Sequence, residues 1–533
     1  MATPSGAASA TSAAVGEPDL RLKSGPGRWV LFATVLGSAM AAIDATVVGI
    51  ALPAIGHDFK AGLSDLQWVV TAYTLTLAGL LLFAGALGDR YGRKLTFIIG
   101  VIWFAAASLL CGVAINSGML IAARALQGVG AALLTPGSLA IIEASFVPED
   151  RGKAIGAWSG FGGVGTAIGP FLGGWLIQAV SWRLIFAINL PIAVLVTAVA
   201  LRHVPESRDV EATGRVDITG GVLVTLGLVG LTYGLIDGPV RGWTSPLPLA
   251  ALTAGVVLLA VFVWWERRAK APVMPLKLFR SMQFSSANVV TFVVYGALGG
   301  ALFLLPIQLI QVGGYTALEA GISLLPVTLI MLLLSARSGS LAARIGPRLQ
   351  MTVGPLVIAA SFLLFARIGP GANYLTEVLP AVVVFGFGLA INVAPLTATV
   401  LGAVDSKHAG TASAINNDVA RGASLIAVAV LPAAAGLTGA SYLHRLEFSA
   451  GFRMASFISA GLCAAGALVA GLTIRNPARP PVPAEVEPVP AGARPVPVAQ
   501  ATQAAELQRA LHCGLDAPPA GASLPASTPA SGS

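Results

Sequence analysis

The chain has 533 residues, of which 56% are hydrophobic and only 11% charged, and its mean hydropathy is +0.81. Soluble globular proteins carry roughly a quarter charged residues, so this composition excludes an ordinary soluble protein. The net charge of +8 does not indicate nucleic-acid binding, because the basic residues lie mostly in short loops between apolar runs, without interleaved aromatic residues.

Residues 1–27 are rich in Ala, Ser, Gly and Pro and predict a disordered cytoplasmic N-terminus. The first apolar run exceeds the roughly 7–15 residues of a signal-peptide core, so it predicts a retained membrane span. A bilayer core needs about 20 helical residues. By that length we predict fourteen spans, near 29–53, 66–88, 95–114, 118–142, 154–179, 182–201, 217–236, 247–265, 285–309, 317–337, 350–367, 374–403, 409–436 and 452–473. The Pro- and Ala-rich segment 476–533 predicts a disordered cytoplasmic tail.

The distribution of Lys and Arg predicts how the spans are oriented. With the N-terminus inside, most basic residues fall in inner loops, including Arg90, Arg93, Lys94 and the cluster Arg267–Lys270. This asymmetry satisfies the positive-inside rule. An even number of spans then places the C-terminus in the cytoplasm as well.

One loop pattern occurs twice. Gly85–Arg93 follows span 2, and Gly339–Pro347 follows span 10. The two loops occupy equivalent places if spans 7 and 8 are an insertion between two six-helix halves. We therefore predict an all-α membrane protein with fourteen transmembrane helices in a 6+2+6 plan, with halves at 28–201 and 281–475 and the insertion with its loops at 202–280. Repeated halves of this kind rock around a central site.

Asp44 and Arg124 are charged residues inside apolar spans 1 and 4. A carboxylate there costs at least about 2.5–3.5 kcal/mol, so it must face a cavity, pair with a cation or be protonated. Counted from the predicted outer ends at about 1.5 Å per residue, the two lie at similar depth. Asp44 is then either a titratable group that couples transport to protons or half of a fixed structural pair. We favour coupling, because apolar packing can usually replace such a pair.

The loop after span 2 contains Gly85, Asp89, Arg90, Gly92 and Arg93. Its glycines permit a tight turn, and Asp89 is suited to cap span 3 or to pair with an Arg on a neighbouring helix. The loop would act as a gate latch that breaks and reforms, or as an anchor that fixes topology.

Span 5 is rich in glycine around a proline. Small residues four apart permit close helix contacts, and a proline removes a helix hydrogen bond. The residues that form this pattern are Gly165, Gly169, Pro170, Gly173 and Gly174.

Span 13 carries Asn416, Asn417, Asp418 and Arg421 within about one turn. They would line the cytoplasmic pathway, or Asp418 and Arg421 would satisfy each other as an i,i+3 pair, which we favour. Other polar and aromatic residues are candidates for an amphipathic substrate cavity, although each also fits helix packing. They are Thr46, Tyr73, Gln127, Trp158, Tyr295 and Asn392.

Motifs for catalysis or metal binding are missing from the sequence. It has no Gly-x4-Gly-Lys-Ser/Thr phosphate loop, its five histidines form no ligand cluster, and its three cysteines are scattered. We expect no enzymatic activity, no metal and no cofactor, with transport driven by the proton gradient.

These residues together resemble the major facilitator superfamily, specifically its fourteen-span drug:proton antiporter branch of the EmrB/QacA type, over about residues 28–475. Gly85–Lys94 is similar to the loop signature after span 2, and Arg124–Gly128 to the span 4 motif. Gly165–Gly174 is similar to the span 5 antiporter motif. Two further segments look typical of the fourteen-span branch, Asp44–Pro53 and Trp182–Pro191.

The resemblance implies export of hydrophobic or cationic drugs, or of an endogenous metabolite, across a bacterial inner membrane. Asp44 and Arg124 would take part in proton coupling, and Asp89 with Arg93 in gating. The partners expected are the lipid bilayer, small amphipathic substrates and protons, without nucleic acid or an obligatory protein partner. The alternatives are a proton-coupled symporter or facilitator that imports a nutrient, and a non-transporting membrane scaffold.

Two positions depart from the family pattern. Gly49 stands where family members commonly have Asn, and Ala343 replaces the acidic residue of the second loop.

Overall fold

The computed structural model describes residues 20–208, 217–269, 272, 274–405, 408–439 and 444–476. The predicted disordered tail therefore lies almost entirely outside the described residues, as do the first nineteen residues of the chain. The described structure begins at Leu20, within the segment 1–27 that the sequence predicts to be disordered. Leu20 donates to the Ser145 carbonyl and accepts from the Val147 amide, which fixes this segment against the end of the fourth span.

The described residues are helical, with one isolated backbone bridge and no strand. The helices of the first half and the insertion are α1 (Gly25–Phe59), α2 (Leu63–Tyr91), α3 (Arg93–Gly112), α4 (Ser117–Ser145), α5 (Pro148–Ala179), α6 (Leu184–Ala187), α7 (Asn189–His203), α8 (Ile218–Arg241) and α9 (Pro246–Glu266). Those that follow are η1 (Leu276–Arg280), α10 (Met282–Ile307), η2 (Gln308–Val312), α11 (Ala317–Ser323), α12 (Leu325–Ile345), α13 (Pro347–Phe365), η3 (Tyr374–Val378), α14 (Leu379–Gly402), α15 (Ala409–Ala434) and α16 (Arg445–Thr473).

The predicted spans correspond to these helices in order. Thirteen helical segments of the described residues are long and apolar enough to cross a membrane, and the bent helix α2 brings the number to as many as fourteen. Several helices run past their apolar stretches, because capping and polar first turns continue them beyond the bilayer core. α1, for example, begins after Ser24, whose hydroxyl accepts from the Gly27 amide, and ends at Lys60 in the left-handed conformation.

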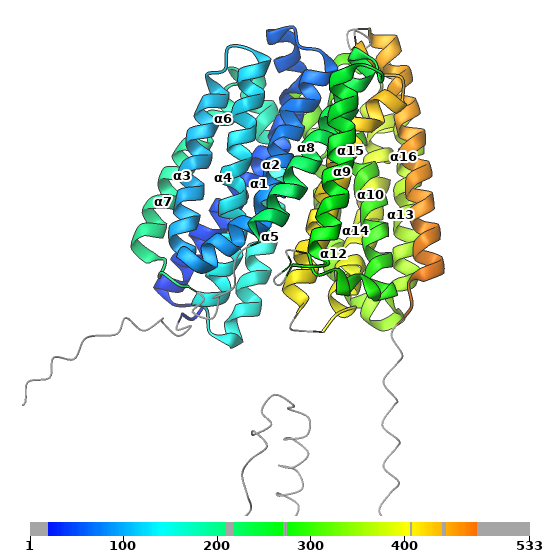
Figure 1. Ribbon diagram of the computed structural model, residues 1–533. Helices are drawn as coiled ribbons and strands as arrows, with labels where there is room; N and C mark the ends of the chain where they lie inside the picture. The colour runs from blue at the N-terminus through cyan, green and yellow to red at the C-terminus, as the bar shows by residue number, and fades with distance from the viewer. Residues whose placement is uncertain are drawn as a thin grey trace, which may run out of the picture. The chain divides into compact units, whose positions relative to one another are not determined.

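Two six-helix halves pack by the same rules. In the first half α1 contacts α5 and α7, while α4 contacts α2 and α3. In the second half α10 contacts α15 and α16, while α14 contacts α12 and α13. These are equivalent pairs when each half is counted from its first span. The fold is therefore a 6+2+6 arrangement in which α8 and α9 are the insertion (Figure 1).

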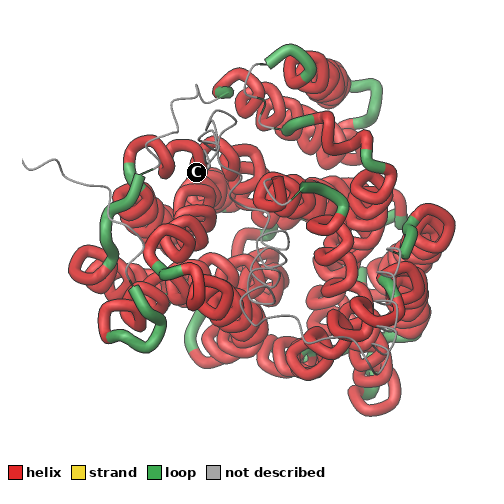
Figure 2. The backbone as a smooth tube through the Cα atoms, turned by 90° about the horizontal axis from the view of Figure 1, so that it is seen from below, coloured by secondary structure: helices red, strands yellow, loops and turns green. Residues whose placement is uncertain are grey.

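The helices run side by side between two ends of the bundle. We call the end at which α1 begins and α16 finishes the inner end, and the opposite end the outer end (Figure 1). Both described chain ends lie at the inner end, as an even number of spans requires. Seen from this end, the described residues are helical rods joined by short loops (Figure 2). The charge distribution predicts that the inner end is cytoplasmic.

The halves meet at the outer end on both sides of the bundle. On one side α5 packs on α11, where a Cβ at Gly174 would lie only 2.7 Å from the Cα of Leu318. On the other side α2 packs on α15, where Gln67 donates to the carbonyls of Val428 (2.6 Å) and Ala429 (3.3 Å). The insertion helix α8 contacts both α2 and α15.

At the inner end the same face of α5 is uncovered. Gly152, Gly156 and Gly163 precede Gly174 by nearly whole numbers of helical turns, so they share its face. Among the residues that the structure describes, and apart from the nearby backbone of α5 itself, no atom lies within 4 Å of a Cβ placed at any of these three. The halves are therefore closed at the outer end and parted at the inner end, which is an inward-facing arrangement if the inner end is cytoplasmic.

Equivalent caps hold the two repeated loops. Gly92 has φ +121°, and the Glu206 carboxylate accepts from the Lys94 amide (3.1 Å) and the Leu95 amide (3.2 Å) at the start of α3. In the second half Gly346 has φ +86°, and Asn476 accepts from the Arg348 amide. Each cap comes from the segment just after the last span of its half, so it ties that segment to the loop.

Replacing Gly92 by Ala is expected to destabilise the protein by about 1–3 kcal/mol, because its φ suits only glycine and a Cβ would lie 2.7 Å from Glu206. Thermal unfolding of the purified protein measures the effect. Gly156→Ala is the matched control, since its Cβ would meet nothing. Equal melting temperatures for the two variants would contradict the strain assigned to Gly92.

Candidate functional site

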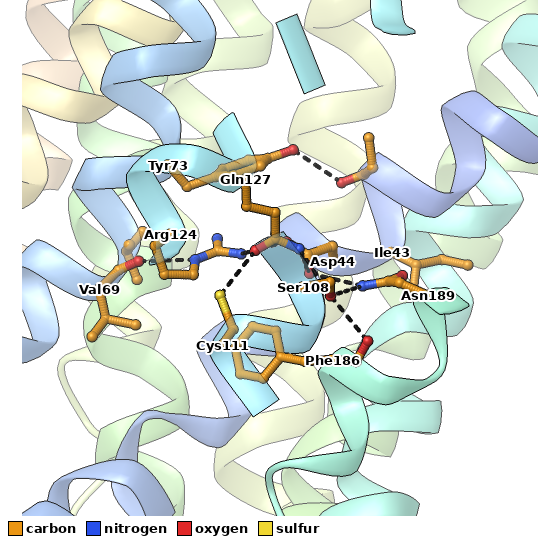
Figure 3. A network of polar contacts seen from close by, with 12 residues as sticks. Ile43, Asp44, Val69, Tyr73, Ser108, Cys111, Arg124, Gln127, Phe186 and Asn189 are labelled. Atoms are coloured by element: carbon orange, nitrogen blue, oxygen red, sulfur yellow. Dashed lines mark hydrogen bonds and ion pairs between the residues drawn. The ribbon is translucent and has the colours of Figure 1, made fainter. Parts of the chain in front are cut away.

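The two buried charges predicted from the sequence meet inside the first half. Arg124 on α4 and Asp44 on α1 form an ion pair of 2.5 Å between Nη1 and Oδ2, and each side chain is only 1% exposed. Figure 3 shows the pair at the centre of a network of polar side chains. The similar depth expected from the sequence thus corresponds to direct contact.

Two amides complete the environment of the Asp44 carboxylate. Gln127, one turn after Arg124, accepts from its Nη1 (2.6 Å) and donates to Asp44 Oδ1 (2.8 Å). Asn189, at the start of α7, donates to Asp44 Oδ1 (3.2 Å) and to the Ser108 hydroxyl (2.9 Å). Three side-chain donors therefore converge on one buried carboxylate and offset the cost of removing it from water.

Arg124 is held from a third helix as well. Its Nε donates to the Val69 carbonyl of α2 (3.1 Å), and its guanidinium lies 4.4 Å from the ring centre of Tyr73. The Tyr73 hydroxyl in turn donates to the Ala41 carbonyl of α1 (3.4 Å). With Ser108 of α3, the network joins α1, α2, α3, α4 and α7, so a change of charge on Asp44 acts on all five helices.

Asn189, Ser108 and Cys111 belong to this network but were not predicted from the sequence as site residues. The Ser108 hydroxyl donates to the Phe186 carbonyl (2.9 Å), and the Cys111 thiol lies 3.6 Å from Gln127 Oε1. An isolated amide within the apolar span 6 was a signal for Asn189. A single hydroxyl or thiol in a membrane helix is too common to be one.

A central cavity of about 280 Å³ lies between the halves, lined by residues of α1, α2, α5, α10 and α15. The described residues that line it are apolar apart from four hydroxyl groups, and none of them has a charged side chain. Each hydroxyl donates to a backbone carbonyl, which leaves its oxygen able to accept a hydrogen bond. The four are Thr46, Thr71, Thr74 and Ser424.

The buried network lies directly behind the wall of this cavity. Ala45 and Thr46 line the cavity on α1, next to Asp44 in the chain, and Thr74 lines it on α2, next to Tyr73. A shift of α1 around Asp44 would therefore move the cavity wall.

Of the six residues predicted to line a substrate cavity, only Thr46 lines the central one. Tyr73 and Gln127 instead hold Arg124. Trp158 donates to the Ser38 hydroxyl of α1 (2.9 Å), and Tyr295 packs against a hydrophobic core to which both halves contribute. Asn392 is buried on α14 against Gly354 of α13. None of these five lines this cavity, and their role as cavity residues stays a prediction.

The loop after span 2 forms contacts within its own half. Arg93 donates to Asp89 Oδ1 through Nε (2.9 Å), while Glu206, and not Asp89, caps α3. Arg90 is exposed beside the Tyr91 ring, and Gly85 faces Pro136 of α4 at 3.8 Å. With the halves closed at the outer end, Asp89 and Arg93 thus pair with each other.

The span 5 glycines are contact points along α1. A Cβ at Gly165 would lie 3.1 Å from that of Ala39, and one at Gly169 would lie 3.2 Å from the Ile43 carbonyl oxygen. Gly173 approaches Val47 in the same way, at 3.0 Å. Pro170 lines the central cavity, and Gly174 meets α11. α5 therefore packs on α1 along one face and on the opposite half along another.

The four residues of span 13 do not act as one group. Asn416 donates to Asn288 and Thr291 of α10, and Asn417 donates to its own helix. Asp418 and Arg421 form no ion pair, and Asp418 Oδ1 and Arg421 Nε are both buried without a hydrogen-bond partner. The structure does not show the favoured self-satisfied pair, because the Asp418 side chain lines a pocket together with residues of the insertion. Asp418 faces the insertion.

Comparison with known sequences agrees with this architecture. The model of the Major Facilitator Superfamily matches residues 34–429. The chain is 36% identical to the methylenomycin A resistance protein of Bacillus subtilis over 409 residues, 76% of this chain and 87% of the relative. It is 36% identical to the tetracenomycin C resistance and export protein of Streptomyces glaucescens over 405 residues, 75% of this chain and 74% of the relative.

Solved structures show the same fold at low sequence identity. A crystal structure of the peptide transporter POT in complex with sulfate matches with a TM-score of 0.62 and 12% identity, over 86% of this chain and 98% of that one. A bacterial homologue of the human lysosomal transporter Spinster, in an inward-facing and unoccupied conformation, matches with a TM-score of 0.60 and 16% identity, over 85% and 97%. The fold, the family match and the bacterial relatives together show that the chain is a multi-pass membrane protein that belongs to the major facilitator superfamily.

Proposed function

We propose that the protein is a secondary active efflux transporter, which exports small amphipathic drugs or metabolites from a bacterial cell in exchange for protons. The observation that carries this proposal is the Asp44–Arg124 network behind the wall of the central cavity. The names of the relatives, which include antibiotic resistance and export proteins, support the direction of transport and the class of substrate.

The central cavity suits molecules that are mostly apolar. Four hydroxyl oxygens offer acceptors to a substrate with a few N–H or O–H groups, while the rest of the lining offers apolar contact. Without a charged side chain in its lining, this cavity favours neutral or weakly polar substrates.

Proton exchange at Asp44 would change the packing of α1. The ionised carboxylate holds Arg124, Gln127 and Asn189, and a proton on it removes the charge that keeps this network together. α1 is then free to shift against α4, and α5 follows because its glycines pack along α1. Since α5 also forms the outer contact between the halves, a change of protonation at Asp44 would be transmitted to the contact that closes the outer end.

The energy available is sufficient for export. One proton moving down about 100 mV supplies roughly 2.3 kcal/mol. Because about 1.4 kcal/mol corresponds to a tenfold concentration ratio, this energy can sustain a substrate concentration outside that is nearly fiftyfold higher than inside. Asp44 would take the proton from the outer side and release it to the inner side when substrate is bound.

Everted membrane vesicles test the proposal. Respiration acidifies their interior and quenches a pH-sensitive acridine dye, and adding a substrate of an antiporter restores fluorescence as protons leave. A panel of methylenomycin A, tetracenomycin C and ethidium is compared in vesicles with and without the protein. Dequenching that depends on the protein supports antiport. A further acidification supports symport, and no response to any compound, with no uptake of it either, supports the scaffold alternative.

A further inference from the structure

A second cavity, of about 330 Å³, lies beside the two-helix insertion and shares no lining residue with the central cavity. We call it the lateral pocket. Its walls come from α2, α8, α9, α10 and α15 and are almost entirely apolar. The residues on which its chemistry depends are Phe83, Asp217, Phe262, Phe292 and Asp418.

The insertion builds this pocket by packing on the seam between the halves. Thr225 of α8 donates to the Gly79 carbonyl of α2 (3.0 Å), and a Cβ at Gly79 would lie 2.8 Å from the Thr225 methyl group. At the inner end, Asp217 caps α8 through the Gly220 amide (2.9 Å) and accepts from the Trp265 indole of α9 (2.9 Å). The Asp217 carboxylate is therefore engaged in holding the hairpin.

Asp418 is the second carboxylate of the pocket, and it differs from Asp217 in its partners. It forms no hydrogen bond or ion pair with the described residues, and its Oδ1 is buried. Arg421 is near enough to attract it through space, yet the two make no contact. A carboxylate at membrane depth without a partner is expensive, which indicates that something outside the chain completes its environment.

The side chains that line the pocket indicate which kind of ligand would complete the environment of Asp418. Phenyl rings of Phe83, Phe262 and Phe292 provide apolar contact and faces that attract a cation, and Asp418 provides one negative charge. The volume is at the small end of the roughly 300–1,000 Å³ typical of ligand sites. The ring of Phe292 is 45% exposed, so part of the pocket is open to the surface of the structure.

We propose that the lateral pocket binds a small amphipathic organic cation, with Asp418 as its counter-ion. The central cavity, which lacks a charged lining, takes neutral substrates, and the insertion completes, next to Asp418 of the second half, a separate site for cations. The use of this site to load cations from the inner leaflet for export rests on the proposed function, whereas the binding itself does not.

Tetraphenylphosphonium and tetraphenylborate, which match in size and differ in the sign of their charge, test this site on the full chain in lipid nanodiscs without a pH gradient. We expect saturable binding of the cation by the wild type, at least tenfold weaker binding by Asp418→Asn, and no saturable binding of the anion. Asp405→Asn is the control, because it removes an exposed carboxylate of the same half and leaves the pocket unchanged. Its affinity for the cation should equal that of the wild type.

Two further variants test the place of binding independently of charge. Gly221 and Gly422 line the pocket from opposite walls, and a Cβ at either meets nothing within 4 Å. Gly221→Leu and Gly422→Leu should therefore fill the pocket without disturbing helix packing, and both should weaken cation binding. Cation binding unaffected by Asp418→Asn and by both leucines, or equal binding of the anion, would overturn the inference.

The outcomes separate this inference from the proposed function. If the protein exports a neutral compound against protons but Asp418→Asn binds the cation like the wild type, only the lateral site fails. If cation binding depends on Asp418 but no compound dequenches the dye in everted vesicles, only the proposed function fails.

Discussion

Replacing Asp44 by Asn is expected to abolish proton-driven export, reducing dye dequenching in everted vesicles to the level of vesicles without the protein. The variant keeps the shape of the side chain but cannot release a proton, so the network no longer changes with the gradient. The substitution also leaves Arg124 buried without its counter-ion, which costs about 3–5 kcal/mol for a broken buried pair. A loss of activity alone would therefore not distinguish coupling from folding.

The double variant Asp44→Asn/Arg124→Gln makes that distinction. It removes both buried charges, so folding should recover relative to the single variant while proton coupling does not. Purified yield and thermal unfolding report on folding, and vesicle transport reports on coupling. A double variant that regained proton-driven export would show that the pair is structural.

Asp58→Asn serves as the control on the same helix. Asp58 accepts from Arg183 (2.7 Å) and from the Trp182 indole (3.0 Å) at the outer end of α1, and its side chain is 42% exposed. Exposed pairs of this kind contribute about 1 kcal/mol or less. Export by this variant should therefore stay close to that of the wild type.

Gly174→Val is expected to reduce transport at least tenfold, because the new side chain would meet the backbone of Ala317 and Leu318 where α5 crosses α11. The outer ends of the halves could then no longer close, and the protein would favour an outward-facing arrangement. Spin labels at Gly156→Cys and Gly410→Cys, on the inner ends of α5 and α15, should move closer together.

Gly461→Val is the matched control for this variant. Gly461 lies on an exposed face of α16, where a Cβ meets nothing within 4 Å, so the substitution carries the same cost in helix propensity without the contact. Unchanged label distances in Gly174→Val, together with transport equal to that of Gly461→Val, would exclude a role for Gly174 in outer closure.

Energetic cost explains which parts of the site could be predicted from the sequence. Asp44 and Arg124 stood out because two charges in apolar spans must be compensated, and their matching depth suggested contact. Ser108 did not, because a hydroxyl is cheap enough in a membrane helix to serve ordinary packing. Asn189 was overlooked, although its isolated amide in an apolar span was a signal. The residues that line the central cavity, such as Ala45 and Leu302, are the same types that fill the core.

The fold was easier to predict from the sequence than the cavity, for a similar reason. Hydropathy and the repeated loop report on whole helices, and the helices follow the predicted order. Which face of a helix turns toward the opposite half depends on rotations that a nearly uniform apolar sequence does not encode. Asp418 illustrates this limit, since the sequence placed it in the polar group of span 13, but its direction toward the insertion came only from the structure.

Proton release on substrate binding tests most directly whether Asp44 exchanges a proton for substrate. The purified protein in weakly buffered nanodiscs receives a compound that dequenched the dye in vesicles, and a soluble pH indicator records the protons set free. We expect the wild type and Asp58→Asn to release protons in proportion to the substrate bound, and Asp44→Asn to bind substrate without releasing any. Equal release by Asp44→Asn and the wild type would contradict the assignment of proton coupling to Asp44.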